Sequence, residues 1–174
     1  AYGADNPAFP ISFTGFVGSD TTASLQNPPV ATTKADRTSP VGSYNIEASG
    51  GSDANYDFAN LDAAKLQVIP RDQTITFNAV PSPTYGDSIS LGASADSGLP
   101  ITYTVLSGPA LVGGKTLTLS GLGRVTVAAD QPGDQNTNPA KTVTQTFDVK
   151  AKALTVTGIT ATSKDYDGTT SATV

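Results

Sequence analysis

Apolar and polar residues alternate with a period of two along most of the chain, in short runs separated by turns rich in Gly, Pro, Asp and Ser. In the run 123–129, for example, Val125 and Val127 alternate with polar or small neighbours. This alternation is typical of strands with one buried face, and no stretch sustains the 3.6-residue period of a helix. The strands expected in the central part are 73–77, 88–95, 101–105, 110–112, 115–120, 124–129 and 141–149.

Turn signals separate these expected strands. Gly113-Gly114 is a two-residue hairpin signal, and Pro81-Ser-Pro83 breaks the preceding run. About seven short strands, with turns every 8–12 residues or so, are the signature of an immunoglobulin-like β-sandwich. The predicted fold class is therefore all-β, with tandem sandwich domains.

The chain repeats itself at a distance of 81 to 83 residues. An offset of 81 relates Val68 to Val149 and Tyr85 to Tyr166, and it relates the run 42–48 to the run 123–129. A further copy of the tyrosine motif begins at Tyr2, 83 residues before Tyr85. Self-similarity at one period indicates tandem domains of about that size.

The repeat divides the chain into residues 1–70, 71–152 and 153–174. The middle unit is complete, whereas the first has no counterpart of the expected strand 73–77. The last segment supplies such a strand in Leu154, Thr155, Val156 and Thr157 and ends soon after the next tyrosine motif. This arrangement suits a fragment of a longer polypeptide. Alternatively, residues 154–157 pair with the open edge of the first unit in another copy, because strand addition satisfies idle backbone groups.

Composition narrows the functional classes. The 174 residues carry a net charge of −5 and include no Cys, Met, Trp or His. The scattered Lys and Arg residues argue against nucleic-acid binding, which needs a basic patch, and no apolar run approaches the length of a membrane span. Without His and Cys, the Ser-His-Asp and Cys-His arrangements are impossible, and the acidic residues form no distinctive pair. We expect no catalytic residues and no membrane insertion by this segment.

Several motifs resemble known families of bacterial repeats. The first unit, with Tyr2-Gly-Ala-Asp, Thr14-Gly-Phe-Val and Gly42-Ser-Tyr44, resembles the MBG ("mostly bacterial, glycine-rich") domain. The middle unit, with Gln73-Thr-Ile-Thr-Phe and Ser107-Gly-Pro-Ala, is similar to bacterial Ig-like repeats, and the tail Lys164-Asp-Tyr-Asp-Gly is similar to the start of YDG repeats. These resemblances cover nearly the whole chain. They imply a long exported bacterial protein of the adhesin or haemagglutinin type, with stalk or spacer domains and no established catalytic residues.

The tyrosine motifs are the feature best shared between the copies. A sugar- or metal-binding corner is one interpretation; a tight turn, with Gly at positive φ and Asp capping the backbone, is the one we favour. All copies would need the same turn. The residues concerned are Tyr2, Gly3, Asp5, Tyr85, Gly86, Asp87, Tyr166, Asp167 and Gly168.

Calcium is the one cofactor with any sequence signal. Asp53, Asn55 and Asp57 place oxygen atoms at alternate positions, as in the start of a calcium-binding loop, and Asp165 and Asp167 form a second weak candidate. Neither the Asp53 segment nor its counterpart Asp134-Gln-Asn136-Thr-Asn138 continues with the Gly and Glu that such a loop requires, and Asx turns explain both of these segments without metal. We therefore expect no metal. An intramolecular Lys–Asn crosslink is also disfavoured, because Glu47, the only Glu, is expected to point outward.

Three functional hypotheses follow. The first is a rigid spacer in which short links, 68–72 and 149–153, join neighbouring repeats of the same polypeptide. The second is a glycan- or protein-binding module built on the aromatic residues of the first unit. The third is a filament subunit that binds other copies by strand addition through residues 154–157. All three place the protein outside the bacterial cell.

Overall fold

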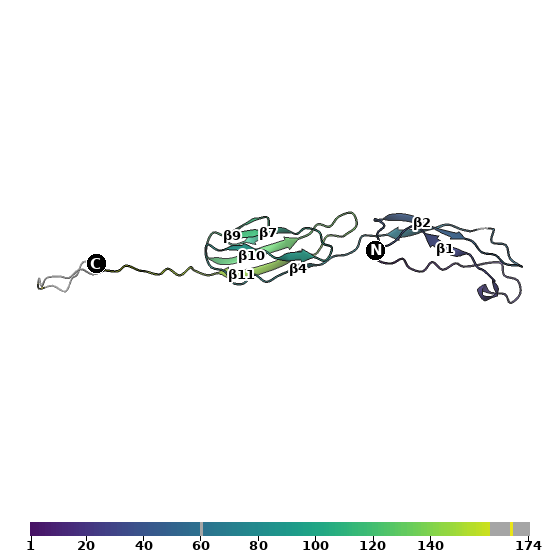
Figure 1. Cartoon of the computed structure of the whole chain (residues 1–174), viewed down its shortest axis with the longest axis horizontal. Helices are drawn as coiled ribbons and strands as arrows, with labels where there is room; N and C mark the ends of the chain where they lie inside the picture. The colour runs from purple at the N-terminus through teal and green to yellow at the C-terminus, as the bar shows by residue number, and fades with distance from the viewer. Residues whose placement is uncertain (60, 161–167, 169–174) are drawn as a thin grey trace.

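The computed structural model describes residues 1–59, 61–160 and 168, and within them the chain is all-β, which confirms the predicted fold class. The described residues contain eleven strands, which form antiparallel sheets, and one short 3-10 helix. Figure 1 shows two strand-bearing parts arranged end to end, with the N-terminus at their junction and residues 151–160 leaving the second part at its opposite end. We call residues 1–70 the first part and residues 71–150 the second part.

The first part contains a single sheet of three strands. They are β1 (Val30–Thr33), β2 (Gly42–Ser49) and β3 (Ala64–Val68), in the order β1-β2-β3, preceded by the 3-10 helix η1 (Thr22–Ser24). Strand β2 alternates strictly, with Tyr44, Ile46 and Ala48 half-buried and their neighbours exposed. Residues 5–17 belong to no strand, and part of this segment lies opposite that half-buried face.

The second part is a sandwich with a continuous core. Sheet β11-β10-β7 and sheet β5-β9-β8 both contribute residues to one hydrophobic cluster, as does the short pair β4-β6. The arrangement is consistent with the predicted β-sandwich. The strands are β4 (Ile75–Phe77), β5 (Ser88–Ser90), β6 (Ala93–Ala95), β7 (Thr102–Ser107), β8 (Ala110–Gly113), β9 (Thr116–Leu119), β10 (Gly123–Asp130) and β11 (Val143–Val149).

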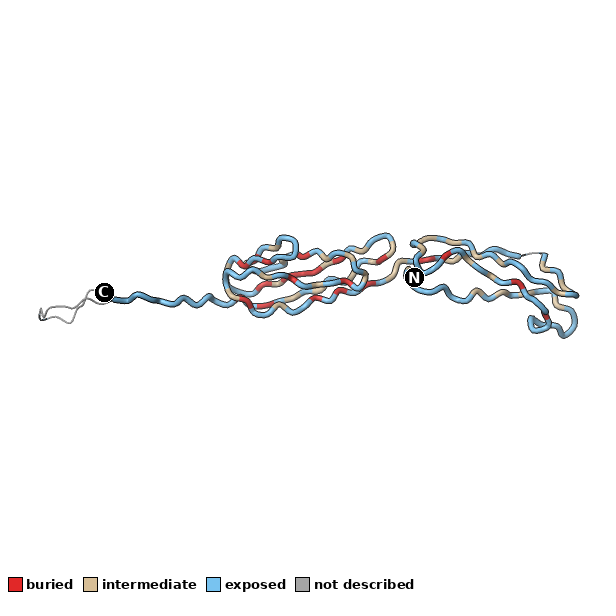
Figure 2. The backbone as a smooth tube through the Cα atoms, viewed as in Figure 1, coloured by how far each residue is buried: buried red, intermediate tan, exposed pale blue. Residues whose placement is uncertain are grey.

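Alternation along these strands produces the core. Leu117, Val125 and Val127 are 0% exposed, and Phe77 packs against Tyr103 at a ring-centroid distance of 5.7 Å. Figure 2 shows buried residues throughout the second part and few in the first. The buried apolar residues of the first part are Leu25, Ala35 and Val68. Burial of apolar surface is the main source of folding free energy, so the second part is the better stabilised of the two.

The sequence repeat has a structural counterpart in the last two strands of each part. Gly42 pairs with Val68 between β2 and β3, and Gly123 pairs with Val149 between β10 and β11, so the 81-residue offset relates both the strands and their register. The two parts differ ahead of these hairpins. Hairpin β8–β9 lies between β7 and β10, whereas only residues 34–41 join β1 to β2. Among the described residues, the first part thus has no counterpart of hairpin β8–β9.

The expected strand 88–95 is two strands in different sheets. Strand β5 pairs with β9, and β6 pairs with β4. The chain changes sheets at Leu91 and Gly92: the Leu91 amide donates to the Lys115 carbonyl oxygen, and the Gly92 carbonyl oxygen accepts from the Asn78 amide. A Cβ on Gly92 would lie 3.0 Å from Nδ2 of Asn78, so a larger residue at this crossing would require the Asn78 side chain to shift.

Candidate functional site at the junction of the two parts

Arg71 and Asp72, which follow the first part directly, are hydrogen-bonded to a loop of their own part, residues 131–140. The Arg71 amide donates to the Asn136 carbonyl oxygen at 3.0 Å, and the Asn138 amide donates to the Arg71 carbonyl oxygen at 2.8 Å. The side-chain Nδ2 of Asn138 donates to Asp72 Oδ1 at 2.8 Å. These bonds align the linking segment with the loop, and Arg71 and Thr137 form a parallel β-bridge.

Among the described residues, one side chain is hydrogen-bonded from this loop to the first part. Asn136 Oδ1 accepts a hydrogen bond of 2.9 Å from the Val41 amide, which is half-buried. On the other side of the linker, the Tyr2 amide donates to the Ile69 carbonyl oxygen at 2.9 Å. The link between the parts is therefore held from both sides, and it is short (Figure 1). That residues 68–72 form a stiff link stays a prediction, and the bonds Val41–Asn136 and Tyr2–Ile69 are the contacts that would stiffen it.

Buried polar side chains hold the junction loop in shape. Gln73 Nε2 donates both to Gln131 Oε1 at 3.0 Å and to the Asn138 carbonyl oxygen at 2.8 Å. Gln73 and Gln131 are 6% and 4% exposed. Buried amides with all partners satisfied rigidify their surroundings. Sequence analysis missed this pair, because two Gln residues 58 positions apart carry no local signal.

Two copies of the tyrosine motif form tight turns, and each turn is hydrogen-bonded to the residue that follows the last strand of its part. Gly3 and Gly86 have φ of 82° and 86°. The Tyr85 amide donates to the Lys150 carbonyl oxygen at 2.8 Å, which corresponds to the bond from Tyr2 to Ile69. Both acceptors directly follow a buried valine at the end of the last strand, so the motif sets the direction in which the chain leaves each part.

The aspartates of these two motifs have different roles. Asp87 Oδ2 accepts from the Thr84 amide at 2.8 Å and so caps its own turn. Asp5 instead forms a surface ion pair with Arg37 at 3.0 Å, and Arg37 contributes its carbonyl oxygen to the Gly3 amide. In the third motif, Gly168 has a φ of 75°, whereas Asp165, Tyr166 and Asp167 lie outside the described residues.

At the weak calcium candidate around Asp53, both carboxylate oxygens of Asp53 accept hydrogen bonds from backbone amides. Asp53 Oδ1 accepts from the Asn55 amide, and Oδ2 accepts from the Gln26 amide, each at 2.9 Å. These bonds lower the pKa of Asp53 below its ordinary value of 3.8, because they favour the charged carboxylate. Asp57 is exposed, and no three acidic side chains gather among the described residues.

The first part has an open groove of about 680 Å³ over one face of its sheet, lined by apolar side chains and by polar ones such as Asp57 and Asp62. Its walls include Ile46 and Ala48 from the sheet and Ile11 and Phe13 from the unpaired segment. The aromatic residues of this part gather there: Phe16 and Tyr56 meet edge to face at a ring-centroid distance of 5.5 Å. Tyr56 donates its hydroxyl to Asp20 Oδ2 at 2.6 Å, and this bond raises the pKa of Tyr56.

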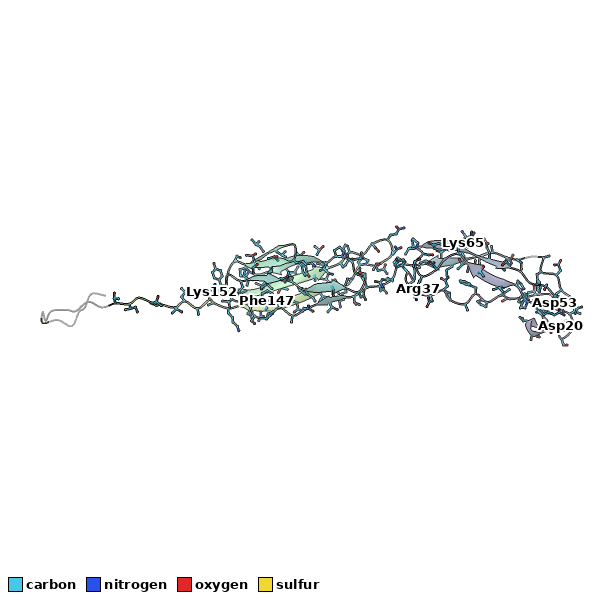
Figure 3. The ribbon with its side chains drawn as sticks, viewed as in Figure 1. Asp20, Arg37, Asp53, Lys65, Phe147 and Lys152 are labelled. Carbon is cyan, nitrogen blue, oxygen red and sulfur yellow. The ribbon has the colours of Figure 1, made fainter. Side chains whose placement is uncertain are left out.

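Residues 154–157 lie on an extended segment that leaves the second part and contacts no sheet. Leu154 and Val156 are 89% and 77% exposed, and Ile159 is 75% exposed. The segment forms no strand among the described residues. Figure 3 shows Lys152 at the end of the second part and Asp20 and Asp53 at the opposite end of the molecule.

Comparison with known families gives one match. Residues 1–67 match the family model of the MBG domain (YGX type), which confirms the resemblance seen in the first unit. A search of curated proteins found no match. The MBG domain is a structural repeat of surface proteins and is not known as an enzyme. No helix of the described residues is both long and apolar enough to cross a membrane.

Proposed function

We propose that this chain is a non-catalytic stalk segment of a large exported bacterial surface protein of the adhesin type. The observation that carries the proposal is the junction, in which Asn136 bonds to Val41 while its own backbone binds the linking residue Arg71. A linker held in this way transmits orientation from one repeat to the next, which a flexible tether cannot do. Its partners are then the neighbouring repeats of the same polypeptide, and it needs no cofactor.

In this proposal the repeats are domains bounded near residues 70 and 152. The link at 150 is arranged like the link at 69, because the Tyr85 turn holds Lys150 as the Tyr2 turn holds Ile69. A polypeptide built of such repeats would extend in one direction, with each exit fixed by a turn of its own part. Such an array holds a distal binding domain away from the cell surface.

The substitution Asn136→Ala tests this function. It removes the bond to Val41 and leaves the backbone bonds of Arg71 in place. A hydrogen bond contributes about 1 kcal/mol net, which corresponds to about a fivefold larger population of open junctions. Spin labels on Val30→Cys and Leu111→Cys, both exposed sites, report the distance between the parts without interference, since the chain has no other Cys.

We expect one narrow distance distribution in the parent chain and a broader one in Asn136→Ala. Asn136→Asp is the matched control, because its carboxylate keeps an acceptor for the Val41 amide. Broad distributions in all three chains would show that the parts move independently and would refute a stalk role.

A further inference from the structure

The segments through which the chain enters and leaves the second part, residues 71–85 and 136–150, run in the same direction. Arg71 and Thr137 form a parallel β-bridge near the junction, and Thr84 and Lys150 form another at the opposite end of the part. One offset of 66 residues relates the partners of both bridges (71 to 137 and 84 to 150), and β4 contacts β11 between them. We call this pair of segments the seam.

Hydrogen bonds join the two segments at three places along the seam. At the junction end they are the bonds of the linking residue to the loop 131–140, described above. In the middle, Gln145 Nε2 on β11 donates to the Phe77 carbonyl oxygen on β4 at 2.9 Å. At the far end, the Lys150 amide donates to the Pro83 carbonyl oxygen and the Tyr85 amide donates to the Lys150 carbonyl oxygen, both at 2.8 Å. The seam is thus bonded from one end of the second part to the other.

The direction of the two segments decides how a pull along the chain loads the seam. Residue 70 precedes the first segment at the junction, and residues 151–160 follow the second segment at the opposite end (Figure 1). A pull therefore draws the first segment toward the junction and the second segment away from it, so that the two slide past each other. The hydrogen bonds lie across the direction of sliding, and the three groups of bonds resist together. Strands that are peeled apart from one end lose their bonds one after another and resist less.

The tyrosine motif holds the far end of the seam in a turn. The Asp87 amide donates to the Thr84 carbonyl oxygen at 3.0 Å, and Gly86 has a φ of 86°, as a type II turn requires at its third residue. Tyr85 is the second residue of this turn, a position that favours Pro. Substitution of Tyr85 by Pro therefore removes the amide that bonds to Lys150 and preserves the turn.

We propose that the seam bears tensile load, so that the second part stays folded under a pull along the chain until the bonds of the seam break. The inference rests on the proposed stalk function, because a stalk carries force along its polypeptide. Resistance to force depends on the rate of unfolding and not on the equilibrium stability. Bonds that are broken in the transition state raise this barrier, whereas core packing that is still present in the transition state does not.

Single-molecule force spectroscopy of the full chain tests the proposal. Ile69→Cys and Leu154→Cys, at sites 57% and 89% exposed, provide the two tethers, and the load between them passes through the second part alone. Tyr85→Pro removes one bond of the seam. Val112→Ala is the matched control, because Val112 packs half-buried against the core on β8, an edge strand whose partner in the sheet is β9.

At constant force we expect Tyr85→Pro to unfold about fivefold faster than the parent chain, the factor that corresponds to one hydrogen bond. Val112→Ala should unfold at the parent rate under load, although both variants destabilise the second part in chemical denaturation. Gln145→Ala, which removes the bond to Phe77, should behave like Tyr85→Pro. Equal acceleration by Val112→Ala, or the parent rate in both seam variants, would overturn the proposal.

This experiment and the spin-label experiment fail independently. With tethers at residues 69 and 154, the bond from Asn136 to Val41 lies outside the loaded path. A flexible junction would therefore refute the stalk role without changing how the seam breaks. Parent rates in both seam variants beside a rigid junction would refute the load-bearing role alone.

Discussion

Equivalent positions in the two parts should respond differently to truncation, because only one of them lies in a closed core. Val127 on β10 is 0% exposed and belongs to the hydrophobic cluster of the second part. Its counterpart Ile46 on β2 is half-buried beside the open groove. We predict that Val127→Ala destabilises its part more than Ile46→Ala does, although the isoleucine loses more atoms.

The magnitude follows from burial. Val127→Ala deletes two carbons worth ~0.8 kcal/mol each in transfer free energy and leaves a cavity, which brings the loss to about 2–3 kcal/mol. Ile46→Ala deletes three carbons that are only half removed from water, and the space left opens into the groove. Its loss is therefore about 1 kcal/mol. For a part of this size the Val127 substitution lowers the melting temperature by roughly 10–15 °C.

Hydrogen exchange of individual backbone amides measures each loss where it occurs. The amides of β10 report the second part and those of β2 the first, in samples dilute enough to be monomeric. Val127→Ala should accelerate exchange throughout β7, β10 and β11, and Ile46→Ala should affect β1–β3 only and more weakly. An equal or larger effect of Ile46→Ala would mean that the first part has a closed core, and the reasoning about its groove would be refuted.

Two further predictions concern the loops. The backbone amides of Asn55 and Gln26 hold the pKa of Asp53 below its ordinary value of 3.8. Asp53 therefore stabilises the first part above pH 3.8, and this contribution is lost as the pH falls through the lower pKa of the folded state. NMR titration should find the depressed pKa, and an ordinary value would contradict the hydrogen bonds described. Gly133→Ala should destabilise the junction loop, because a Cβ at Gly133, whose φ is +77°, would lie 2.2 Å from the Thr137 carbonyl oxygen. Gly114 also has a positive φ, +60°, but no atom lies within 4 Å of the Cβ position. Gly114→Ala should therefore cost only about 1 kcal/mol of backbone strain. Chemical denaturation compares the two, and equal losses would exclude the steric argument.

The sequence was sufficient to predict the second part and its core. Alternation placed Val125 and Val127 inward, and both are fully buried. It did not predict the break at Gly92, because alternation continues through the point where the strand changes sheets. Period-two patterns define which side of a strand faces inward, but they carry no information about the sheet to which the strand belongs.

The junction was harder to predict than the strands. The offset identified Asn136 only as the counterpart of Asn55, and the bond from Asn136 to Val41 joins residues 95 positions apart. The repeat offset also did not show that the described residues of the first part contain no counterpart of hairpin β8–β9. The segment before β1 is longer than the segment before β7, and this compensates for the shorter segment between β1 and β2. The repeat offset depends only on the total length between two matching positions, so it does not show how that length is divided among the segments between them.

We infer that the two parts behave as one elongated body, and ¹⁵N relaxation of the 174-residue chain measures whether they do. Relaxation rates depend on how fast, and about which axis, each amide tumbles. The account predicts that amides of β1–β3 and of β4–β11 fit one shared, strongly anisotropic rotational diffusion tensor. Separate tensors with shorter correlation times for the two parts would show that the junction does not hold them together and would contradict the account.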